Sequence, residues 1–399
     1  MALPLTANKP DPHDYLPAPP RAAASVGAAG TAAASSTTAV SDDEFTAIID
    51  YITARGFSFE PWQVAAYITA ARTKPFVILA GVSGTGKSAL PKLIADATGA
   101  SIRIVPVRPD WHDSSELLGY EGLDGKFRPG HLLRAAAAAQ AEPDKQFFFL
   151  LDEMNIARPE YYLAEVLSRI EETGALAAGE TGQPLRPDAS GDAPTGVPWA
   201  DISLSTNLTL IGSVNMDETT FGFSRKVLDR AFVIEFSDVD LSQIGDGDGA
   251  VAATSLAWGA DHWERAAATL ARHPDRHSPL VAQVISTLDE VNQLLTECQL
   301  QFGYRVRDEI ALFCLAAQSA PDAFQTADGG QIGALDLAIS MKVLPRIQGS
   351  GVAIGKLLDQ LANWAQPATG VAPSFPVSGQ RLDMMRRRLV ETGFTNYWL

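Results

Sequence analysis

One short glycine-rich stretch constrains the fold of this chain more than any other, and it reads Gly81-Val82-Ser83-Gly84-Thr85-Gly86-Lys87-Ser88. An apolar run over residues 76–80 precedes it, and a helix-forming run over residues 89–94 follows it. Strand, glycine-rich turn and helix, with the spacing G-x-x-x-x-G-K-S, are typical of a phosphate-binding loop. The glycines let backbone N–H groups point inward, and these groups form an anion site with the helix N-terminus. Lys87 can then reach the β- and γ-phosphates and Ser88 can hold Mg²⁺, so we expect a nucleoside-triphosphate site.

A second pair of candidate residues ends another apolar run. Residues 147–151 are continuously apolar, which predicts a strand buried on both faces of a parallel sheet. Asp152 and Glu153 follow directly, at the carboxyl end of that strand, where open α/β sheets bind ligands. We expect Asp152 to hold the Mg²⁺ shell and Glu153 to polarise the attacking water. A further buried strand over residues 207–215 ends on the polar Asn215.

Length, charge and cysteine content limit the class of protein. A chain of 399 residues is too long for one simple core and suggests two domains and a tail. The formal net charge of −16 argues against a broad DNA-binding face on this chain, because neutralising phosphates needs clustered Lys and Arg. A few basic residues lining the pore of an assembly remain compatible with it. The run Arg386-Arg387-Arg388 is typical of a solvated helix face, with a partner site as the alternative.

The same composition indicates a compartment. Cys298 and Cys314 are the two cysteines, and we expect both to be buried free thiols. No apolar run approaches the length of a membrane span. The N-terminus lacks the pattern of a signal peptide or a basic amphipathic presequence. We therefore expect a soluble, cytoplasmic protein.

Changes in composition and periodicity divide the chain into three parts. Residues 1–40 are rich in Ala, Pro, Ser and Thr, which predicts a disordered tail, with a docking peptide as the alternative. Residues 41–240 alternate helices and strands, which predicts a doubly wound α/β domain opened by helices over 41–73. Residues 241–399 begin with a linker around 246–249 and continue as a mostly helical domain. Its expected helices lie at roughly 253–272, 278–300, 306–319, 333–346, 352–364 and 378–392.

Capping signals refine the helices. Ser41 is expected to cap the first helix, Pro61 to begin the second, and Ser378 to cap the last. Continuous helices are also expected over residues 161–172 and 221–230.

Three further segments bear on the site. Phe57, Phe59 and Trp62 precede the first strand and are expected either to cup the nucleotide base or to pack in the core. A hairpin is expected around residues 122–127. The loop over residues 173–206 is unusually long, which predicts a hairpin insertion or a mobile segment.

With these features in view, the chain resembles the AAA+ superfamily and, more narrowly, its McrB branch, the motor subunits of modification-dependent restriction systems. The resemblance covers about residues 45–395. Its most specific segments are residues 151–158, which read LDEMNIAR and look like that branch's D-E-x-N-x-A segment, and residues 211–220, which look like its I-G-x-x-N strand and turn. The hairpin near Gly125 and the 173–206 loop resemble insertions of the wider clade that contains MoxR-type ATPases and dynein. This resemblance implies a five-stranded parallel sheet followed by a C-terminal helical lid domain.

The resemblance also implies roles for single residues. Asn215 matches sensor 1, an amide that positions the attacking water. Arg230 matches the arginine finger, which reaches the nucleotide of a neighbouring subunit and stabilises charge in the transition state. Arg305 and Arg307 both fall where sensor 2 enters from the lid, and the sequence does not decide between them.

Two departures from the McrB pattern limit what carries over. Glu218 and Thr219 stand where that branch has Asp and Arg after the sensor strand, which puts its preference for GTP in doubt. The N-terminal tail is too short and too polar to be a domain that reads modified DNA. Target reading and cleavage would then lie in other chains.

These observations predict an ATPase that uses Mg²⁺, with GTP as the alternative fuel. The resemblance implies a ring oligomer, typically a hexamer, although the sequence does not fix the subunit number. It also implies a separate nuclease subunit in an anti-phage restriction system, with DNA contacted indirectly or through the assembled ring. The alternative is a MoxR-like chaperone that remodels protein partners.

Overall fold

The computed structural model describes residues 38–175, 182–216, 221–237, 255–367 and 375–398, all of which belong to one unit over residues 36–399. Most of the expected tail and the linker around residues 246–249 lie outside the described residues. The expected domain boundary near residue 240 also lies outside them, so it stays a prediction. None of the described helices is both long enough and apolar enough to cross a membrane.

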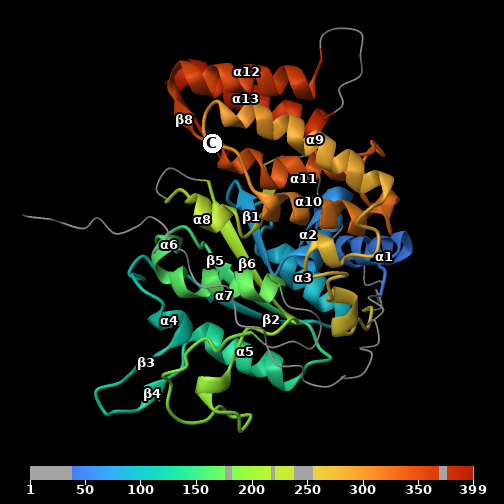
Figure 1. Ribbon diagram of the computed structural model, residues 1–399. Helices are drawn as coiled ribbons and strands as arrows, with labels where there is room; N and C mark the ends of the chain where they lie inside the picture. The colour runs from blue at the N-terminus through green and yellow to red at the C-terminus, as the bar shows by residue number, and fades with distance from the viewer. Residues whose placement is uncertain (1–37, 176–181, 217–220, 238–254, 368–374, 399) are drawn as a thin grey trace, which may run out of the picture. The chain divides into compact units, whose positions relative to one another are not determined.

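A five-stranded parallel sheet forms the centre of the fold, with the strand order β2-β5-β6-β1-β7 (Figure 1). The strands span Phe76–Gly81 (β1), Ser101–Pro106 (β2), Phe147–Asp152 (β5), Leu208–Asn215 (β6) and Phe232–Phe236 (β7). β1 is buried along its whole length, and β6 is buried up to its final residue. Strands of this kind are covered on both faces, as the continuous apolar runs predict. The sheet confirms the expected α/β fold with five parallel strands.

The register of the sheet brings the candidate residues to one edge. Gly81 pairs with Asn215 between β1 and β6, and Leu151 pairs with Gly212 between β5 and β6. Asp152 therefore ends its strand beside Ser213. Because all three strands run in the same direction, the glycine-rich turn, the acidic pair and the final amide of β6 meet at their carboxyl ends.

Two helices precede the sheet and begin where the sequence predicts. In α1 (Asp42–Thr53), the N-cap Ser41 forms a capping box with Glu44. α2 (Pro61–Thr73) has its proline at the first helical position and contacts β1 and β7. Two later helices, α3 (Ala89–Thr98) and α5 (His131–Ala141), contact β5.

Two insertions extend from the α/β part of the chain. β3 (Tyr120–Glu121) and β4 (Phe127–Arg128) form the expected hairpin, after the short helix α4 (Ser115–Leu118). Figure 1 shows this hairpin projecting at the lower left. In the second insertion, isolated antiparallel bridges join Pro184 to Ser203 and Asp192 to Pro198. The described part of the 173–206 loop is therefore a hairpin insertion.

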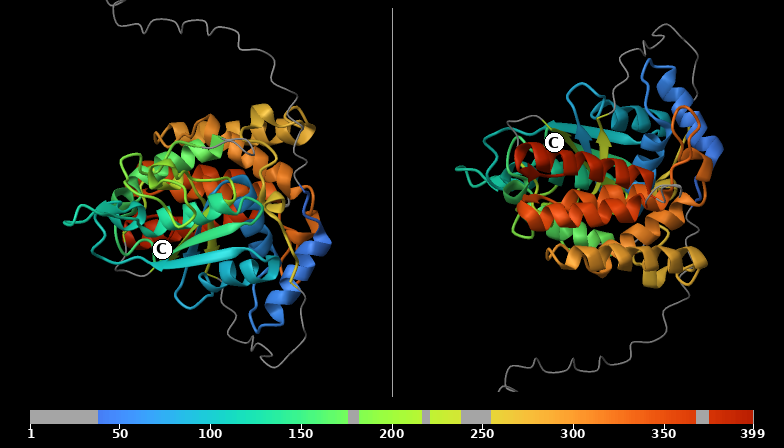
Figure 2. Two further views of the ribbon diagram at one scale, coloured as in Figure 1. Left: turned by 90° about the horizontal axis from the view of Figure 1, so that it is seen from below. Right: turned by 90° about the horizontal axis from the view of Figure 1, so that it is seen from above.

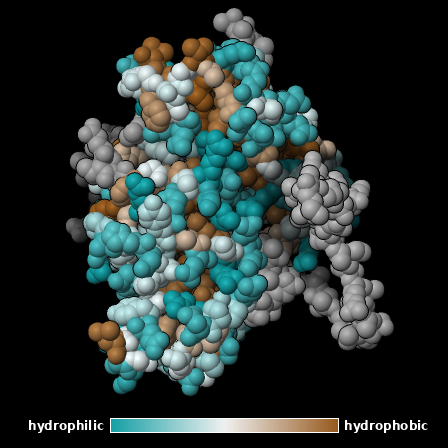
Figure 3. All heavy atoms as spheres, turned by 60° about the vertical axis from the view of Figure 1, so that its left-hand side comes forward, coloured by the Kyte–Doolittle hydropathy of each residue, from teal (hydrophilic) through white to brown (hydrophobic). Residues whose placement is uncertain are grey.

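The C-terminal region is helical, as expected, and lies above the sheet in Figure 1. Its helices are α9 (Pro279–Thr296), α10 (Tyr304–Ala317), α11 (Ala334–Lys342), α12 (Gly351–Ala365) and α13 (Pro376–Thr392). α12 and α13 pack side by side, as the view from above in Figure 2 shows. A short ladder, β8 (Gly349–Ser350) with β9 (Phe394–Thr395), closes the end of this pair. Figure 3 shows a mostly hydrophilic face, with hydrophobic residues gathered at its upper end, where α12 and α13 lie.

The helix expected at 253–272 is wrong for the described residues, which begin at 255. Only two short 3₁₀ turns, Ala260–Trp263 and Leu270–Arg272, interrupt an extended segment. Its backbone is bound to another element instead, because the N–H groups of Leu256 and Trp258 donate to carbonyls at the end of α3, at 2.6 and 3.0 Å. Burial of Trp258 and Trp263 holds the segment in place.

Two other expected helices are interrupted. The helix expected over 161–172 is divided at Leu163 into α6 (Pro159–Tyr162) and α7 (Ala164–Ala175). The helix expected over 221–230 is reduced to α8 (Arg225–Leu228). The backbone N–H of Phe221 donates to the carbonyl of Asn155 at 2.9 Å, which holds the residues before α8 outside a helix.

Ser378 and Cys298 also differ from expectation. Pro376 begins α13, so Ser378 lies inside the helix, fully buried, where its backbone N–H donates to Asp336 at 2.9 Å. Cys314 is buried, but Cys298 is only half-buried because it lies in the turn after α9. In the arginine run, Arg386 pairs with acids of α12 and α13 and is largely exposed, as a solvated face requires.

A buried group of three charged residues, which we call the inner triad, joins the helical region to the sheet. Lys74, just before β1, and Lys342, at the end of α11, bind the two oxygens of Glu309 on α10, at 2.5 and 2.6 Å. Lys342 Nζ also donates to the carbonyls of Asp229 and Ala231, just before β7. The helical region is therefore bound to the segment before β1 by an ion pair and to the segment before β7 by hydrogen bonds.

Candidate functional site

The glycine-rich turn after β1 has the backbone of a phosphate-binding loop. Gly81 has φ 154°, and a side chain there would meet the carbonyl of Phe236 on β7 at 2.2 Å. Gly86 has φ 84°, and a side chain there would lie 2.9 Å from the ring of Phe59. Lys87 is buried and donates to the carbonyl of Val82 within the loop. The loop leads into α3 through Ser88, so backbone N–H groups at the start of that helix face the turn.

Ser88, which lies between the loop and α3, contacts Asp152 at the end of β5. The Ser88 hydroxyl donates to Oδ1 of Asp152, and the Ser213 hydroxyl donates to the same oxygen at 2.6 Å. Hydroxyl and carboxylate oxygens are the ligands that Mg²⁺ prefers, and the ion keeps several waters while it bridges to phosphate. The donor set therefore fits Mg²⁺ beside the phosphate-binding loop.

Glu153 and Asn215 form the other half of the site. The amide of Asn215 donates to Oε1 of Glu153 at 2.9 Å. Glu153 has φ 52°, a left-handed conformation that non-glycine residues seldom adopt and that costs of the order of 1–3 kcal/mol. Its backbone N–H donates to the Ser213 hydroxyl at 2.9 Å, which holds this turn against β6.

Ser213 is a site residue that the sequence reasoning missed. Its hydroxyl binds the carboxylate of Asp152 and the backbone of Glu153, so one side chain orients both acids. The available signal was a polar residue inside a strand with a buried pattern, two positions before Asn215. A side chain at the preceding residue, Gly212, would lie 2.0 Å from the sulfur of Met154, so glycine is needed for this close packing.

Asn155 binds the end of β6 and so holds the turn that carries Asp152 and Glu153. Its amide donates to the carbonyl of Asn215 at 3.0 Å, and the residue is 3% exposed. The hydroxyl of Tyr162 on α6 donates to the carbonyl of Met154 at 2.7 Å. The acidic pair is thus held by β6 on one side and by α6 on the other.

Comparison with known proteins agrees with this geometry. Residues 76–233 match the AAA domain (dynein-related subfamily), and residues 261–394 match a domain of unknown function (DUF8727). Residues 76–233 therefore have the fold of an AAA+ domain. The match spans the phosphate-binding loop, both acids and Asn215, and it ends within β7.

Solved structures are also similar to this chain. One of them is a crystal structure of a protein from Cytophaga hutchinsonii ATCC 33406, provisionally named an ATPase, with 12% identity and a TM-score of 0.47. The similarity covers 76% of this chain and 87% of that one. No curated protein matches the sequence.

Arg230 lies outside the group formed by Ser88, Asp152, Glu153 and Asn215. Its Nε donates to the carbonyl of Leu167 and its Nη1 to the carbonyl of Lys226, both at 2.9 Å. Its Nη2 is bound to Glu171 on α7. Arg230 is therefore held against α7 in the single chain.

The two candidates for sensor 2 have different surroundings. Arg305, in the first turn of α10, is bound to the second oxygen of Glu171. Arg307 lies over the ring of Tyr304 and pairs with Asp308. The contact through Glu171 brings Arg305, and with it the start of α10, next to Arg230.

The aromatic residues before β1 are divided between two environments. Phe59 lies against Gly86 of the loop and meets Phe236 edge-on, with ring centroids 6.1 Å apart, while Phe57 is exposed. Trp62 lines a cavity of about 350 Å³ together with residues of β7, α11 and α13. In that cavity Glu235 is bound to Arg381.

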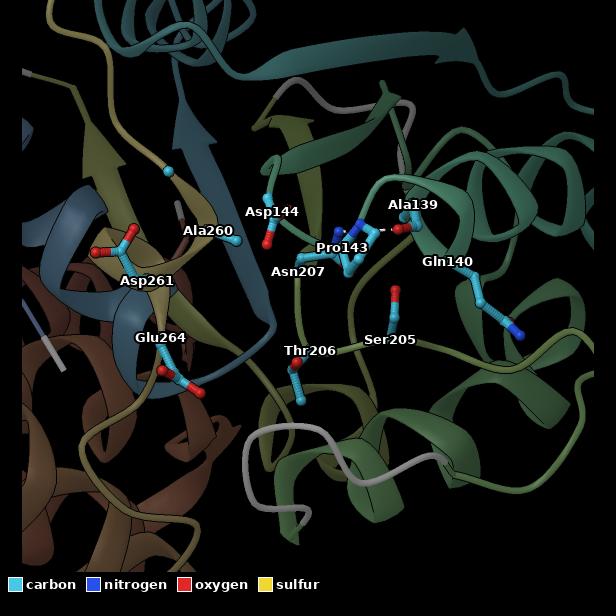
Figure 4. Close-up of a pocket in the computed structure, with 11 residues that line it drawn as sticks. Ala139, Gln140, Pro143, Asp144, Ser205, Thr206, Asn207, Ala260, Asp261 and Glu264 are labelled. Atoms are coloured by element: carbon cyan, nitrogen blue, oxygen red, sulfur yellow. Dashed lines mark hydrogen bonds between the residues drawn. The ribbon is translucent and has the colours of Figure 1, made fainter. Parts of the chain in front are cut away.

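Another cavity lies away from this site. Its volume is about 550 Å³, and it opens near the residues that precede β5 and β6, at the amino ends of the strands (Figure 4). Asp144, Asp261 and Glu264 line it, and burial together with the charge of Asp261 raises the pKa of Glu264. Because the phosphate-binding loop lies at the carboxyl ends, this cavity is separate from the nucleotide site.

Proposed function

We propose that the protein hydrolyses ATP in a ring oligomer whose active sites lie between neighbouring copies. One observation carries this proposal: the pair Ser88 and Asp152 and the pair Glu153 and Asn215 are joined through Ser213 into one hydrogen-bonded group, while Arg230 is held elsewhere. A site of this kind has its metal ligands and water-orienting groups in one subunit. Its arginine must then come from the next subunit, which is how transition-state charge is stabilised in many nucleotide hydrolases.

In this reaction each residue would have a separate task. Lys87 and the loop N–H groups bind the phosphates, and Ser88 with Asp152 would hold Mg²⁺, which neutralises developing charge when bound. Asn215 fixes the carboxylate of Glu153, and Glu153 orients a water molecule for in-line attack on the γ-phosphorus and accepts hydrogen bonds from it. Arg230 of the neighbouring copy stabilises the charge on the transferred group.

We propose ATP as the fuel, with GTP as the alternative. The Trp62 cavity and the position of Phe59 beside Gly86 support a base on this side of the loop. The residues that differ from the McrB pattern, Glu218 and Thr219, lie outside the described residues. Turnover with saturating ATP and with GTP, at one protein concentration, tests the preference: faster turnover with GTP would contradict the proposal.

Hydrolysis itself is tested by Glu153→Gln, which keeps the shape of the side chain and removes its charge. We expect nucleotide binding to persist and turnover to fall by about 10²–10⁴-fold. A variant that hydrolyses ATP at the original rate would exclude the proposed role of Glu153.

The ring is tested by measuring particle mass with Mg²⁺ and a slowly hydrolysed ATP analogue. We expect the mass of a hexamer.

We further propose that the ring drives a separate nuclease subunit in a McrBC-like restriction system. The similarity of residues 151–158 to the McrB branch supports this role, with DNA contacted through the assembled ring. A MoxR-like chaperone is the alternative, favoured by the net charge of −16. Purifying the tagged protein with its native partners distinguishes them: a nuclease subunit and DNA-stimulated turnover support the motor, and a non-nuclease client protein supports the chaperone.

A further inference from the structure

Glu171 on α7 binds two arginines that come from separate parts of the chain. One carboxylate oxygen accepts from Arg230, which follows α8, and the other accepts from Arg305, in the first turn of α10. The two ion pairs are partly open to solvent, because the side chains of Arg230, Glu171 and Arg305 are 18%, 37% and 41% exposed. We call these three residues the outer triad.

The contacts of Arg230 show what Glu171 does there. Two backbone carbonyls hold the guanidinium, through Nε and Nη1, and neither carries a formal charge. Glu171 occupies the remaining edge, through Nη2. An anion from outside the chain would have to meet the guanidinium at this edge, and Arg305 stands on the other side of the same carboxylate.

We propose that the Glu171 carboxylate occupies, in the free subunit, the place that the γ-phosphate of a neighbouring copy takes in the ring. This inference rests on the proposed function of Arg230 in the neighbouring site. Glu171 then competes with that phosphate: its carboxylate binds Arg230 and Arg305 until the neighbouring nucleotide displaces it. The occupant is a nucleoside triphosphate held by the phosphate-binding loop of a second copy.

Exchange of one anion for the other is physically reasonable. A partly exposed carboxylate–arginine pair contributes little net stability, so it can be broken at small cost. A triphosphate offers more charge and more acceptor oxygens, and charge-assisted bonds to it are strong. The carboxylate nevertheless competes well because it belongs to the same chain and is present at high effective concentration. Assembly must therefore displace it, which raises the protein concentration needed to form the ring.

The experiment compares Glu171→Gln with Glu172→Gln. Glu172 is the next residue on α7 and pairs with Arg169 instead, so its substitution is a matched control. For each chain, particle mass is measured against protein concentration with Mg²⁺ and a slowly hydrolysed ATP analogue. ATP turnover is measured over the same concentrations, and thermal unfolding shows that each variant is folded.

We expect Glu171→Gln to lower the concentration for half-assembly about fivefold or more, with the plateau turnover unchanged. Glu172→Gln should behave as the original chain. Glu171→Asp keeps the charge on a shorter side chain and should lie between the two. A Glu171→Gln midpoint equal to that of the original chain would overturn the proposal, as would a lower plateau with an unchanged midpoint, since Glu171 would then act only within the ring.

Failure of the proposed function gives a different result. If the original chain hydrolyses ATP as a monomer and Arg230→Ala leaves that rate unchanged, the trans site is wrong, and the role of Glu171 is wrong with it. If the original chain forms an active ring that depends on Arg230, while Glu171→Gln has no effect on assembly, only the inference about Glu171 is overturned.

Discussion

The inner and outer triads each consist of one glutamate bound to two positively charged side chains, but the two triads differ in how far they are buried. The side chains of Lys74, Glu309 and Lys342 are 5%, 8% and 0% exposed. Those of Arg230, Glu171 and Arg305 are 18%, 37% and 41% exposed. Both triads join the α/β part of the chain to the helical region.

This difference separates a structural role from a functional one. A charge in the inner triad has no water to replace its partner, so all three members are needed together. A charge in the outer triad can exchange its partner for water or for another anion. The inner triad is therefore suited to fixing α10 and α11 on the sheet, and the outer triad to exchanging contacts during assembly.

The largest expected effect is on turnover, when Arg230 of the outer triad is replaced. Arg230→Ala should lower turnover about 10³–10⁵-fold at concentrations that form the ring, because the transition state loses its trans cation. The free energy of unfolding in urea should change by only about 1 kcal/mol, since the ion pair that Arg230 makes with Glu171 is partly open to solvent. A large loss of stability with modest loss of turnover would instead place Arg230 with the structural residues.

The next effect concerns the inner triad. Glu309→Ala leaves two buried lysines without their carboxylate, so the free energy of unfolding should fall by about 3–5 kcal/mol. Urea denaturation measures it, with Asp308→Ala on the same helix as the control. Asp308 pairs with the partly exposed Arg307, so its removal should cost far less. Equal losses in the two variants would contradict the contrast between the triads.

The pH dependence of stability tests the inner triad in a second way. Burial lowers the pKa of Lys342 from 10.5 to about 8, against the attraction of Glu309. Between pH 8 and 10.5 the unfolded chain then binds one more proton than the folded chain, so this group makes stability rise with pH. When the free energy of unfolding is plotted against pH, the slope for the original chain should exceed the slope for Lys342→Met by up to about 1.4 kcal/mol per pH unit. Parallel profiles for the two chains would show that Lys342 is not titrating as expected.

The smallest expected effect is on the stability of the outer triad. Glu171→Gln should change the free energy of unfolding by about 1 kcal/mol or less, because the ion pairs are partly exposed and screened by solvent. Urea denaturation at low and high salt measures this change. If the loss approaches that of Glu309→Ala, the outer triad is structural too, and exchange with a phosphate becomes untenable.

Local patterns in the sequence predicted the parts of the site that depend on neighbouring residues. The G-x-x-x-x-G-K-S turn, the acids that end a buried strand, and Asn215 at the end of another all follow from spacing and from continuous apolar runs. The register of the sheet then brings them to one edge, because all three strands run in the same direction. The roles of Arg230, Arg305 and Arg307 came from the resemblance and stay predictions.

Other local patterns were misleading because tertiary contacts outweighed them. Residues 255–272 lack a helix because their backbone groups bind the end of α3 and two tryptophans are buried there. Residues 221–224, before α8, are not helical because the backbone N–H of Phe221 is bound to Asn155. In each case a partner distant in sequence supplied the hydrogen bonds that a helix would have supplied locally.

The sequence by itself determined that this chain has a nucleotide site on a parallel α/β sheet, because each element of that site is a local pattern. Only the tertiary structure decided that Ser213 orients both acids, that Glu309 holds two lysines, and that Glu171 joins Arg230 to Arg305. The physical reason is distance along the chain. Glu171 and Arg305 are 134 residues apart and Lys74 and Glu309 are 235 apart, so no local spacing brings them together. Their contacts exist only because the helical region packs on the sheet.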